Sequence, residues 1–343
     1  MREGRSRAKY KAGYIDFEGN IAIPPSYDDA HPFYNGFASV KLGDRWGAID
    51  TKGDLVVSPI SSYPLEYTEG LSSFGFRGKG DLRGVIDKTG NIVIPPRFGT
   101  VSHFSGGLAC FRDRAIAKTA ALYGFIDKAG NELIPPFFDD ARAFSEGLAA
   151  VKIDGAWGYI DRDGLTAIPP RFKMKSGITG PFREGLARAP ENGKWGYIDK
   201  TGTFVIAPEF DMALEFSEGL GRIEIEKRNG YVNFAGEIQI ESTFRRAGDF
   251  SCGVAAVNVG KLSPLIASNP DCDAGFINKL GEFVIAPSFY SVGRFRHGLC
   301  LVETERTIGY INLRGEFIWS APFVDIGFLD PHHILPPEEH KWA

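Results

Sequence analysis

Aspartate or asparagine recurs nine times in this 343-residue chain, each time three residues after one glycine and three residues before another. Six copies carry Asp and three carry Asn: Asp16, Asp50, Asp87, Asp127, Asp161, Asp199, Asn233, Asn278 and Asn312. A row of carboxylates could serve acid–base catalysis or bind calcium. Against both uses, a neutral amide replaces the carboxylate in three copies, and a turn explains the pattern without any ligand. In such a hairpin turn the Asp or Asn side chain accepts a backbone N–H, and the following glycine adopts the left-handed conformation at little cost.

The glycine that precedes each Asp or Asn, here called the anchor glycine, marks an internal repeat. The anchor glycines are Gly13, Gly47, Gly84, Gly124, Gly158, Gly196, Gly230, Gly275 and Gly309, at intervals of 34, 37, 40, 34, 38, 34, 45 and 34 residues. In the basic unit a proline follows the anchor by 12 residues, and the glycine of an aromatic-x-x-Gly motif follows that proline by 11. Internal periods of this size are typical of repeat folds.

Each unit is expected to contain three short β-strands. The first runs from the anchor glycine to the turn, and the second ends at the proline, which cannot donate a ladder hydrogen bond. The third follows the aromatic-x-x-Gly motif. Because no helical periodicity appears, we predict an all-β fold built from nine units of about 34 residues.

Residues 1–325 are predicted to form one open, elongated or curved array of these units, with a closed propeller as the alternative architecture. Residues 326–343 are predicted to form a C-terminal cap or tail, because the last unit of an open array leaves one face unpaired. Evenly spaced aromatic residues could form a stacking surface for sugars or bases. A core between neighbouring units explains them better.

Three stretches carry a resemblance to a known family: WGYIDKTG at 195–202, VIAPEFD at 205–211 and FSEGLAAVK at 144–152. They are similar to the bacterial WG, or KWG, repeat, which is present here in nine degenerate copies over most of the chain. The Trp-Gly pair itself occurs only at Trp46, Trp157 and Trp195. The resemblance implies a repeat module attached to varied proteins, without a general enzymatic activity.

Composition excludes several function classes. A net charge of −4 gives no global reason to expect nucleic acid or membrane binding, and no apolar stretch approaches the ~20 residues of a membrane span. The four cysteines lack CxxC spacing, and no nucleotide-binding motif is present. The basic N-terminus lacks the apolar run of a signal peptide. We therefore expect a cytoplasmic protein with no cofactor, no metal and no catalytic residues.

Function is expected where the repeat changes length. The segment between the third strand and the next anchor gains three residues in Gly70–Gly84, six in Gly107–Gly124 and eleven in Gly253–Gly275. Insertions at one place in a repeat emerge on one face, which is often the binding face. Two of these segments, and a four-residue insertion before Gly185, are rich in basic side chains: Arg77, Lys79, Arg83, Arg112, Arg114, Lys118, Arg171, Lys173, Lys175 and Arg183.

We predict from these loops a non-enzymatic protein–protein interaction module or scaffold. Its partner would be a protein with an acidic surface rather than nucleic acid. Ordinary solvated loops are the simpler interpretation of the same charges. The alternative function is a binding protein for a small anionic or carbohydrate ligand, held in a pocket lined by residues outside the repeated positions.

Overall fold

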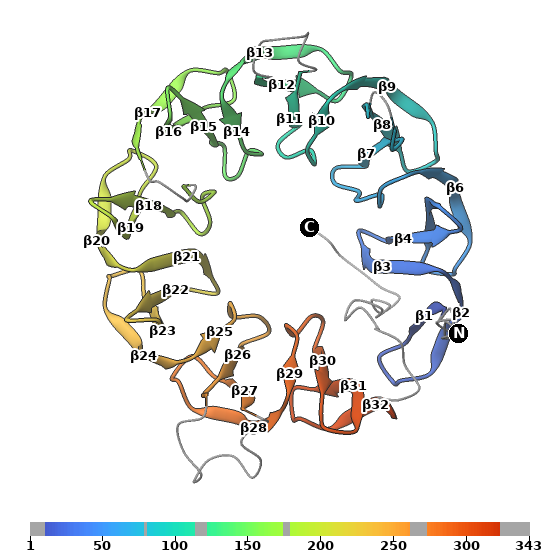
Figure 1. Cartoon of the computed structure of the whole chain (residues 1–343), viewed down its shortest axis with the longest axis vertical. Helices are drawn as coiled ribbons and strands as arrows, with labels where there is room; N and C mark the ends of the chain where they lie inside the picture. Colours follow the sequence, from blue (N-terminus) through green and yellow to red (C-terminus); the bar gives the residue numbers. More distant parts are fainter. Residues whose placement is uncertain (1–10, 79–80, 114–121, 174–178, 261–272, 323–343) are drawn as a thin grey trace, which may run out of the picture.

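The computed structural model describes residues 11–78, 81–113, 122–173, 179–260 and 273–322. In that part of the chain all regular structure is β, arranged as small antiparallel sheets that stand side by side around a central space (Figure 1). Eight sheets have three or four strands, and one near the N-terminus has two. The sheets are the blades of a propeller-like ring. The prediction of an all-β repeat fold is confirmed.

In chain order, the first blade consists of β1 (Ala12–Ile15) and β2 (Ile21–Tyr27), and the second of β3 (Asp29–Tyr34), β4 (Phe37–Leu42), β5 (Arg45–Asp50) and β6 (Leu55–Ser61). The third consists of β7 (Leu71–Gly75), β8 (Arg83–Asp87) and β9 (Ile92–Phe98). The fourth consists of β10 (Thr100–Val101), β11 (Leu108–Arg112), β12 (Tyr123–Asp127) and β13 (Glu132–Phe138). The next three consist of β14 (Asp140–Ala141), β15 (Ala149–Ile153), β16 (Ala156–Ile160) and β17 (Thr166–Phe172); β18 (Ala187–Glu191), β19 (Lys194–Ile198) and β20 (Phe204–Phe210); β21 (Met212–Ser217), β22 (Leu220–Ile225), β23 (Arg228–Val232) and β24 (Ile238–Phe244). The last two consist of β25 (Arg246–Ala247), β26 (Ala255–Asn258), β27 (Ala274–Ile277) and β28 (Phe283–Phe289); β29 (Ser291–Val292), β30 (Leu299–Glu303), β31 (Thr307–Asn312) and β32 (Phe317–Pro322).

A full blade has four strands that follow each other from the centre of the ring to its rim, as β21 to β24 do (Figure 1). The sequence prediction of three strands per unit missed the innermost strand, which is present in six of the nine sheets within the described residues. In four of these sheets this strand has only two residues, as Thr100–Val101 in β10. Two residues are too few to produce an alternating apolar pattern of their own, so the sequence does not reveal these four strands. In β3 and β21 the strand has six residues, and a bulge interrupts its pairing with the second strand.

The anchor glycine and the proline are parts of one bulge. Trp195 pairs with Phe210 and Tyr197 pairs with Ile206, so an advance of two residues along β19 corresponds to four residues along β20. The bulged backbone closes over Gly196, where an added Cβ would lie 2.5 Å from the Ile206 carbonyl oxygen. The predicted strand end at the proline was wrong, because β20 continues two residues beyond it. Proline is tolerated inside this strand because it lies in the bulge, where the ladder pairing with β19 is interrupted.

Aromatic side chains fill the core, as the sequence predicted. The ring of Tyr197 lies 4.8 Å from that of Phe216 of the next blade, and the Tyr197 hydroxyl donates to the Leu214 carbonyl at 2.7 Å. Neighbouring blades also meet at their turns, where Gly202 packs against Ile168 of the preceding blade. Each unit therefore buries its apolar surface only together with its neighbour.

The last unit packs on the first. Ile15 of β1 and Trp319 of β32 border a small apolar cluster formed by Leu301, Ile308 and Tyr310. The repeat array is confirmed, but its predicted open form is not: the array closes into the propeller that we gave as the alternative. The surface that an open array would leave unpaired is covered by the opposite end of the array. The predicted cap at residues 326–343 lies outside the described residues.

Candidate interaction surface

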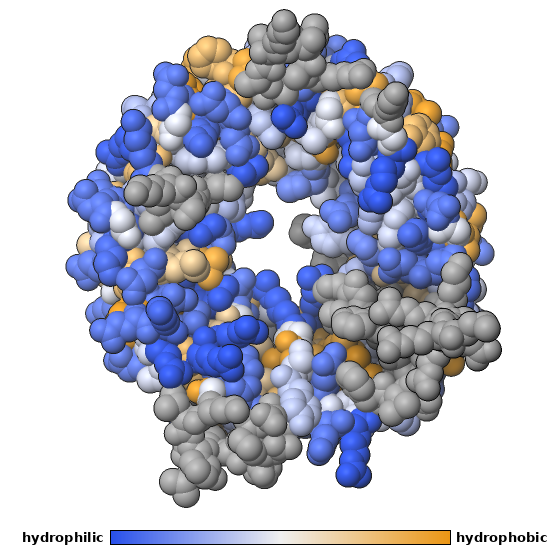
Figure 2. Space-filling view, in the orientation of Figure 1, coloured by the Kyte–Doolittle hydropathy of each residue, from blue (hydrophilic) through white to orange (hydrophobic). Residues whose placement is uncertain are grey.

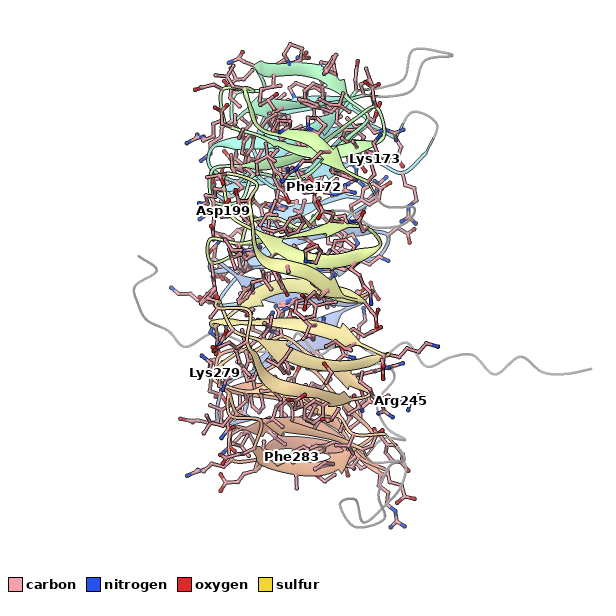
Figure 3. All side chains as sticks on the ribbon, turned by 90° about the vertical axis from the view of Figure 1, so that its left-hand side faces the viewer. Phe172, Lys173, Asp199, Arg245, Lys279 and Phe283 are labelled. Carbon is pink, nitrogen blue, oxygen red and sulfur yellow. The ribbon has the colours of Figure 1, made fainter. Side chains whose placement is uncertain are left out.

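The strand order gives the ring two different faces. One face, here called the turn face, carries the hairpin turns between the first and second strands and between the third and fourth strands of each blade. The other, here called the loop face, carries the hairpins between the second and third strands and the connections to the next blade. In the side view, Asp199 and Lys279 lie along the turn face, and Lys173 and Arg245 lie along the loop face (Figure 3).

All the length changes of the repeat occur at the loop face. Three lie between β7 and β8, between β11 and β12, and between β26 and β27, which are all second-to-third hairpins. The fourth follows β17, on the connection to the next blade. The described strands that flank all four segments therefore end on one face, and most of the inserted residues lie outside the described part of the chain. Figure 2 views the ring from this side: the described residues seen there are mostly hydrophilic, and apolar ones gather towards the rim.

The short hairpins of the loop face are tied down by acidic residues. The Asp139 carboxylate accepts the backbone N–H of Gly155 at 3.3 Å, and the Asp211 carboxylate accepts that of Glu226 at 2.8 Å. Each acid follows the fourth strand of one blade and caps the hairpin of the next. These carboxylates are therefore used in the scaffold.

The recurring Asp of the turn face is also structural. The Asp199 Oδ1 atom accepts the backbone N–H groups of Thr201 at 2.9 Å and Thr203 at 3.0 Å. The Thr201 hydroxyl donates to the same oxygen at 2.6 Å, and this hydrogen bond holds the pKa of Asp199 below its usual range. A carboxylate whose oxygen accepts three hydrogen bonds within its own turn is a poor general base. The turn interpretation is confirmed.

Hydrogen bonds between blades, which the sequence reasoning missed, account for the Ser-Glu-Gly turns. The Ser217 hydroxyl donates to the Phe250 carbonyl of the next blade at 2.8 Å, and the Glu218 carboxylate accepts the Gly253 N–H at 3.0 Å. Lys279 of that next blade also lies 3.5 Å from the Glu218 carboxylate. The same Glu-to-Gly bond joins three other pairs: Glu69 with Gly107, Glu146 with Gly185, and Glu184 with Gly219. The only sequence signal was the recurrence of Ser and Glu, which does not reveal a partner in the next unit.

The structure separates the ten basic residues that the sequence singled out. Six are described, namely Arg77, Arg83, Arg112, Arg171, Lys173 and Arg183, whereas Lys79, Arg114, Lys118 and Lys175 lie outside the described residues. Arg183 belongs to a turn-face hairpin, whereas Arg77 and Lys173 lie on connections at the loop face. The Arg171 guanidinium donates to the Gly202 carbonyl of the next blade. Arg112 ends a second strand with its guanidinium 5.9 Å from the Tyr123 ring, and Lys173 is exposed on the loop face.

Arg77 and Arg83 are brought together over one aromatic ring. The Arg83 guanidinium lies 3.2 Å from the centroid of Tyr63, and that of Arg77 lies 5.5 Å away. The Tyr63 hydroxyl donates to Asp81 at 2.6 Å. Burial is the main cause that lowers the pKa of Arg83, so this side chain is committed to the fold, whereas Arg77 remains exposed.

A second cation–aromatic contact widens this region. The guanidinium of Arg45 lies 5.3 Å from the ring of Phe76, whose side chain is 43% exposed. Arg45 and the Arg77 backbone N–H both bond the Ser62 hydroxyl, at 2.7 and 3.0 Å, which links the two contacts. We call these residues the Tyr63 cluster: Arg45, Tyr63, Phe76, Arg77 and Arg83. Exposed arginine beside aromatic rings is a composition enriched at protein interfaces.

The described cysteines are all free thiols. Cys110 and Cys300 are buried free thiols, and Cys252 is an exposed one. No group of three or more His, Cys, Asp or Glu side chains is arranged there to hold a metal ion. Nor do those residues contain a helix long and apolar enough to cross a membrane.

The fold defines the class of the protein as a β-propeller built from tandem repeats. The family model described as WG containing repeat matches eight segments: 13–46, 46–79, 84–114, 123–155, 157–195, 195–228, 230–262 and 275–305. These segments cover well over half of the 343 residues, so the chain belongs to the WG repeat family. The ninth unit, which holds β31 and β32, is outside the matched segments.

Solved structures share the architecture at low sequence identity. A crystal structure of a eukaryotic initiation factor aligns with a TM-score of 0.62 and 13% identity, over 93% of this chain and 96% of that chain. At this identity the likeness shows the fold alone. The dihydro-heme d1 dehydrogenase NirN, in complex with DHE, aligns with a TM-score of 0.47 and 11% identity, over 94% of this chain and 81% of that chain. The comparison with curated proteins found no match.

Proposed function

We propose that this propeller is a non-enzymatic interaction module that binds another protein through its loop face. The observation that supports the proposal is the restriction of every repeat-length change to this face. The turn face keeps its lengths and uses its polar groups to join blades. Variable loops on a rigid scaffold are the usual location of binding residues in repeat proteins.

The proposed partner is a protein with an acidic surface. Arg77 and Lys173 are exposed on the loop face, and Arg77 lies within the Tyr63 cluster. Arginine beside an exposed aromatic ring can combine ion pairing with apolar burial. Pairing between exposed charges is screened by salt, so the affinity is expected to fall as ionic strength rises.

Site-specific photo-cross-linking tests the choice of face. A photoreactive amino acid would replace Arg77 or Lys173 on the loop face, or the exposed Lys52 on the turn face as the control. The expected result is one protein captured in cells from both loop-face positions and not from Lys52. Capture from Lys52 alone, or equally from all three positions, would show that the loop face is not the binding surface.

The captured partner then allows a quantitative test. With both proteins purified, the double variant Arg77→Ala, Lys173→Ala is expected to weaken binding about tenfold, and Lys52→Ala to leave it unchanged. If the affinity of the double variant equals that of wild type and does not change with salt concentration, the acidic-partner proposal is contradicted. The lack of enzymatic activity and the cytoplasmic location stay predictions from the sequence. A small-anion ligand is the second candidate function, and a cleft between two blades favours it.

A further inference from the structure

A cleft of about 430 Å³ lies between the last two blades and is lined by residues of β25, β26 and β29. Figure 1 shows these strands side by side in the ring. Its charged lining consists of Arg222, Arg246, Asp249 and Arg294. Phe276 and Val292 supply apolar surface. The volume falls in the range of small-molecule sites, roughly 300–1,000 Å³.

At the two preceding blade junctions an arginine–carboxylate pair occupies this space. At the first, the Nε of Arg188 lies 3.0 Å from a Glu215 carboxylate oxygen of the next blade. At the second, the Nε of Arg222 lies 3.3 Å from a carboxylate oxygen of Asp249. In both, the arginine lies on the second strand of one blade, and the acid lies on the first strand of the next blade (Glu215) or two residues after it (Asp249). The two side chains therefore neutralise each other across the junction.

At the third junction the repeat has exchanged both residues. Strand pairing places Ala256 opposite Phe276, as it places Arg222 opposite Tyr231, so Ala256 occupies the arginine position. Arg294 occupies the acid position, because it follows its anchor glycine by 19 residues, the same distance by which Asp249 follows its own. An arginine–carboxylate pair has thus become an alanine and an arginine. Compared with these two junctions, this exchange removes side-chain volume and leaves a surplus of positive charge.

The positive groups are held facing the cleft. The Arg294 guanidinium donates to the Ser217 hydroxyl at 3.1 Å and to the Phe250 carbonyl at 2.9 Å, and it lies 3.9 Å from the Asp249 carboxylate. Asp249 therefore serves both Arg222 and Arg294. Arg246 is exposed and makes no ion pair with any described residue. Three arginines against one aspartate give the lining a formal charge of 3 − 1 = +2.

We propose that this cleft binds a small organic anion through a phosphate or carboxylate group. Guanidinium forks match both groups with paired N–H donors, and the apolar surface beside them suits the remainder of such a ligand. The cleft adjoins the loop face, because Tyr290 lies on a connection between blades and Arg246 begins the strand that follows another such connection. Its test uses a small anion instead of a protein, so its failure can be distinguished from failure of the proposed protein partner.

Titration of the full chain with inorganic phosphate and, separately, with succinate tests the proposal and distinguishes the two anionic groups. Sodium chloride holds ionic strength constant, and isothermal calorimetry reads the binding. We expect saturable binding of at least one probe at a single site. Arg246→Gln is expected to weaken it about tenfold. The neighbouring Arg245→Gln removes the same charge outside the cleft lining and is expected to leave binding unchanged.

A rebuilt junction gives the sharper test. The double variant Ala256→Arg, Arg294→Glu restores the pair found at the two earlier junctions and fills the cleft. It is expected to retain the melting temperature within a few degrees and to lose anion binding. Wild-type protein that binds neither probe at ~10 mM, or a folded rebuilt variant that binds as wild type does, would overturn the proposal. So would equal effects of Arg246→Gln and Arg245→Gln.

Discussion

Gly196→Ala is expected to destabilise the ring by about 3 kcal/mol, although it adds only a methyl group. The new Cβ would lie 2.5 Å from the Ile206 carbonyl oxygen, 2.7 Å from the Pro208 nitrogen and 2.8 Å from the Ala207 carbonyl carbon. All three are backbone atoms of the bulge and cannot rotate away, so β19 and β20 must separate. Forced shifts of this kind cost about 1–3 kcal/mol, and weakened pairing beside the bulge costs about 1 kcal/mol more.

A melting experiment measures this effect. Unfolding entropy near 2.1 cal/mol/K per residue converts about 3 kcal/mol into a fall of about 4 °C in Tm for a chain of 343 residues. The matched control is Gly248→Ala, whose added Cβ would meet nothing closer than 3.6 Å and whose φ is not positive. That control is expected to change stability by no more than about 0.5 kcal/mol. Equal melting of the two variants would refute the close-approach explanation of the anchor glycine.

Three further predictions concern the turns, the core and the thiols. Asp199→Asn keeps the turn acceptor and should be nearly neutral at pH 7, whereas Asp199→Ala should cost about 1 kcal/mol in denaturant titrations. Because hydrogen bonding lowers the pKa of Asp199, its carboxylate stabilises the fold above the unfolded value of about 3.9, and this contribution is lost as pH falls through the lower folded value. Acid titration of wild type should therefore show a larger loss of stability than that of Asp199→Asn, which lacks the contribution of this one carboxylate. Tyr231→Phe removes a 2.6 Å hydrogen bond to the Gly248 carbonyl and should cost about 1–2 kcal/mol, and unchanged melting would contradict this. Burial raises the pKa of the Cys110 thiol to about 12, so iodoacetamide at pH 8 should modify the exposed Cys252 first, as peptide mapping can check.

The sequence was sufficient for features that depend on local chemistry. The Asp199 turn needs only an acceptor and a glycine three residues later, and both are visible in the repeat. The buried aromatics, such as Tyr197 and Phe216, follow from even spacing in every unit. These features lie within one or two neighbouring strands, so periodicity and turn chemistry predict them.

Closure and site geometry depend on contacts that no local pattern encodes. Ile15 contacts residues of the last blade, which lie near the other end of the sequence. Nothing in the segment around Ile15 distinguishes a ring from an open array. The basic residues show the same limit. Arg183 and Lys173 are ten residues apart in sequence, yet they lie on opposite faces of the ring. Charge counting grouped them, and only the strand order separates them.

The two faces differ because loops and turns respond differently to a change of length. The cost of closing a flexible loop grows slowly, by only about 0.6 kcal/mol for each doubling of its length, so a hairpin such as that between β26 and β27 can gain eleven residues cheaply. A turn-face hairpin has no such freedom. Moving Glu218 by one residue would break its bond to Gly253 and remove its contact with Lys279. Insertions therefore accumulate where they leave the bonds between blades intact, and the loop face can change its surface while the ring keeps its form.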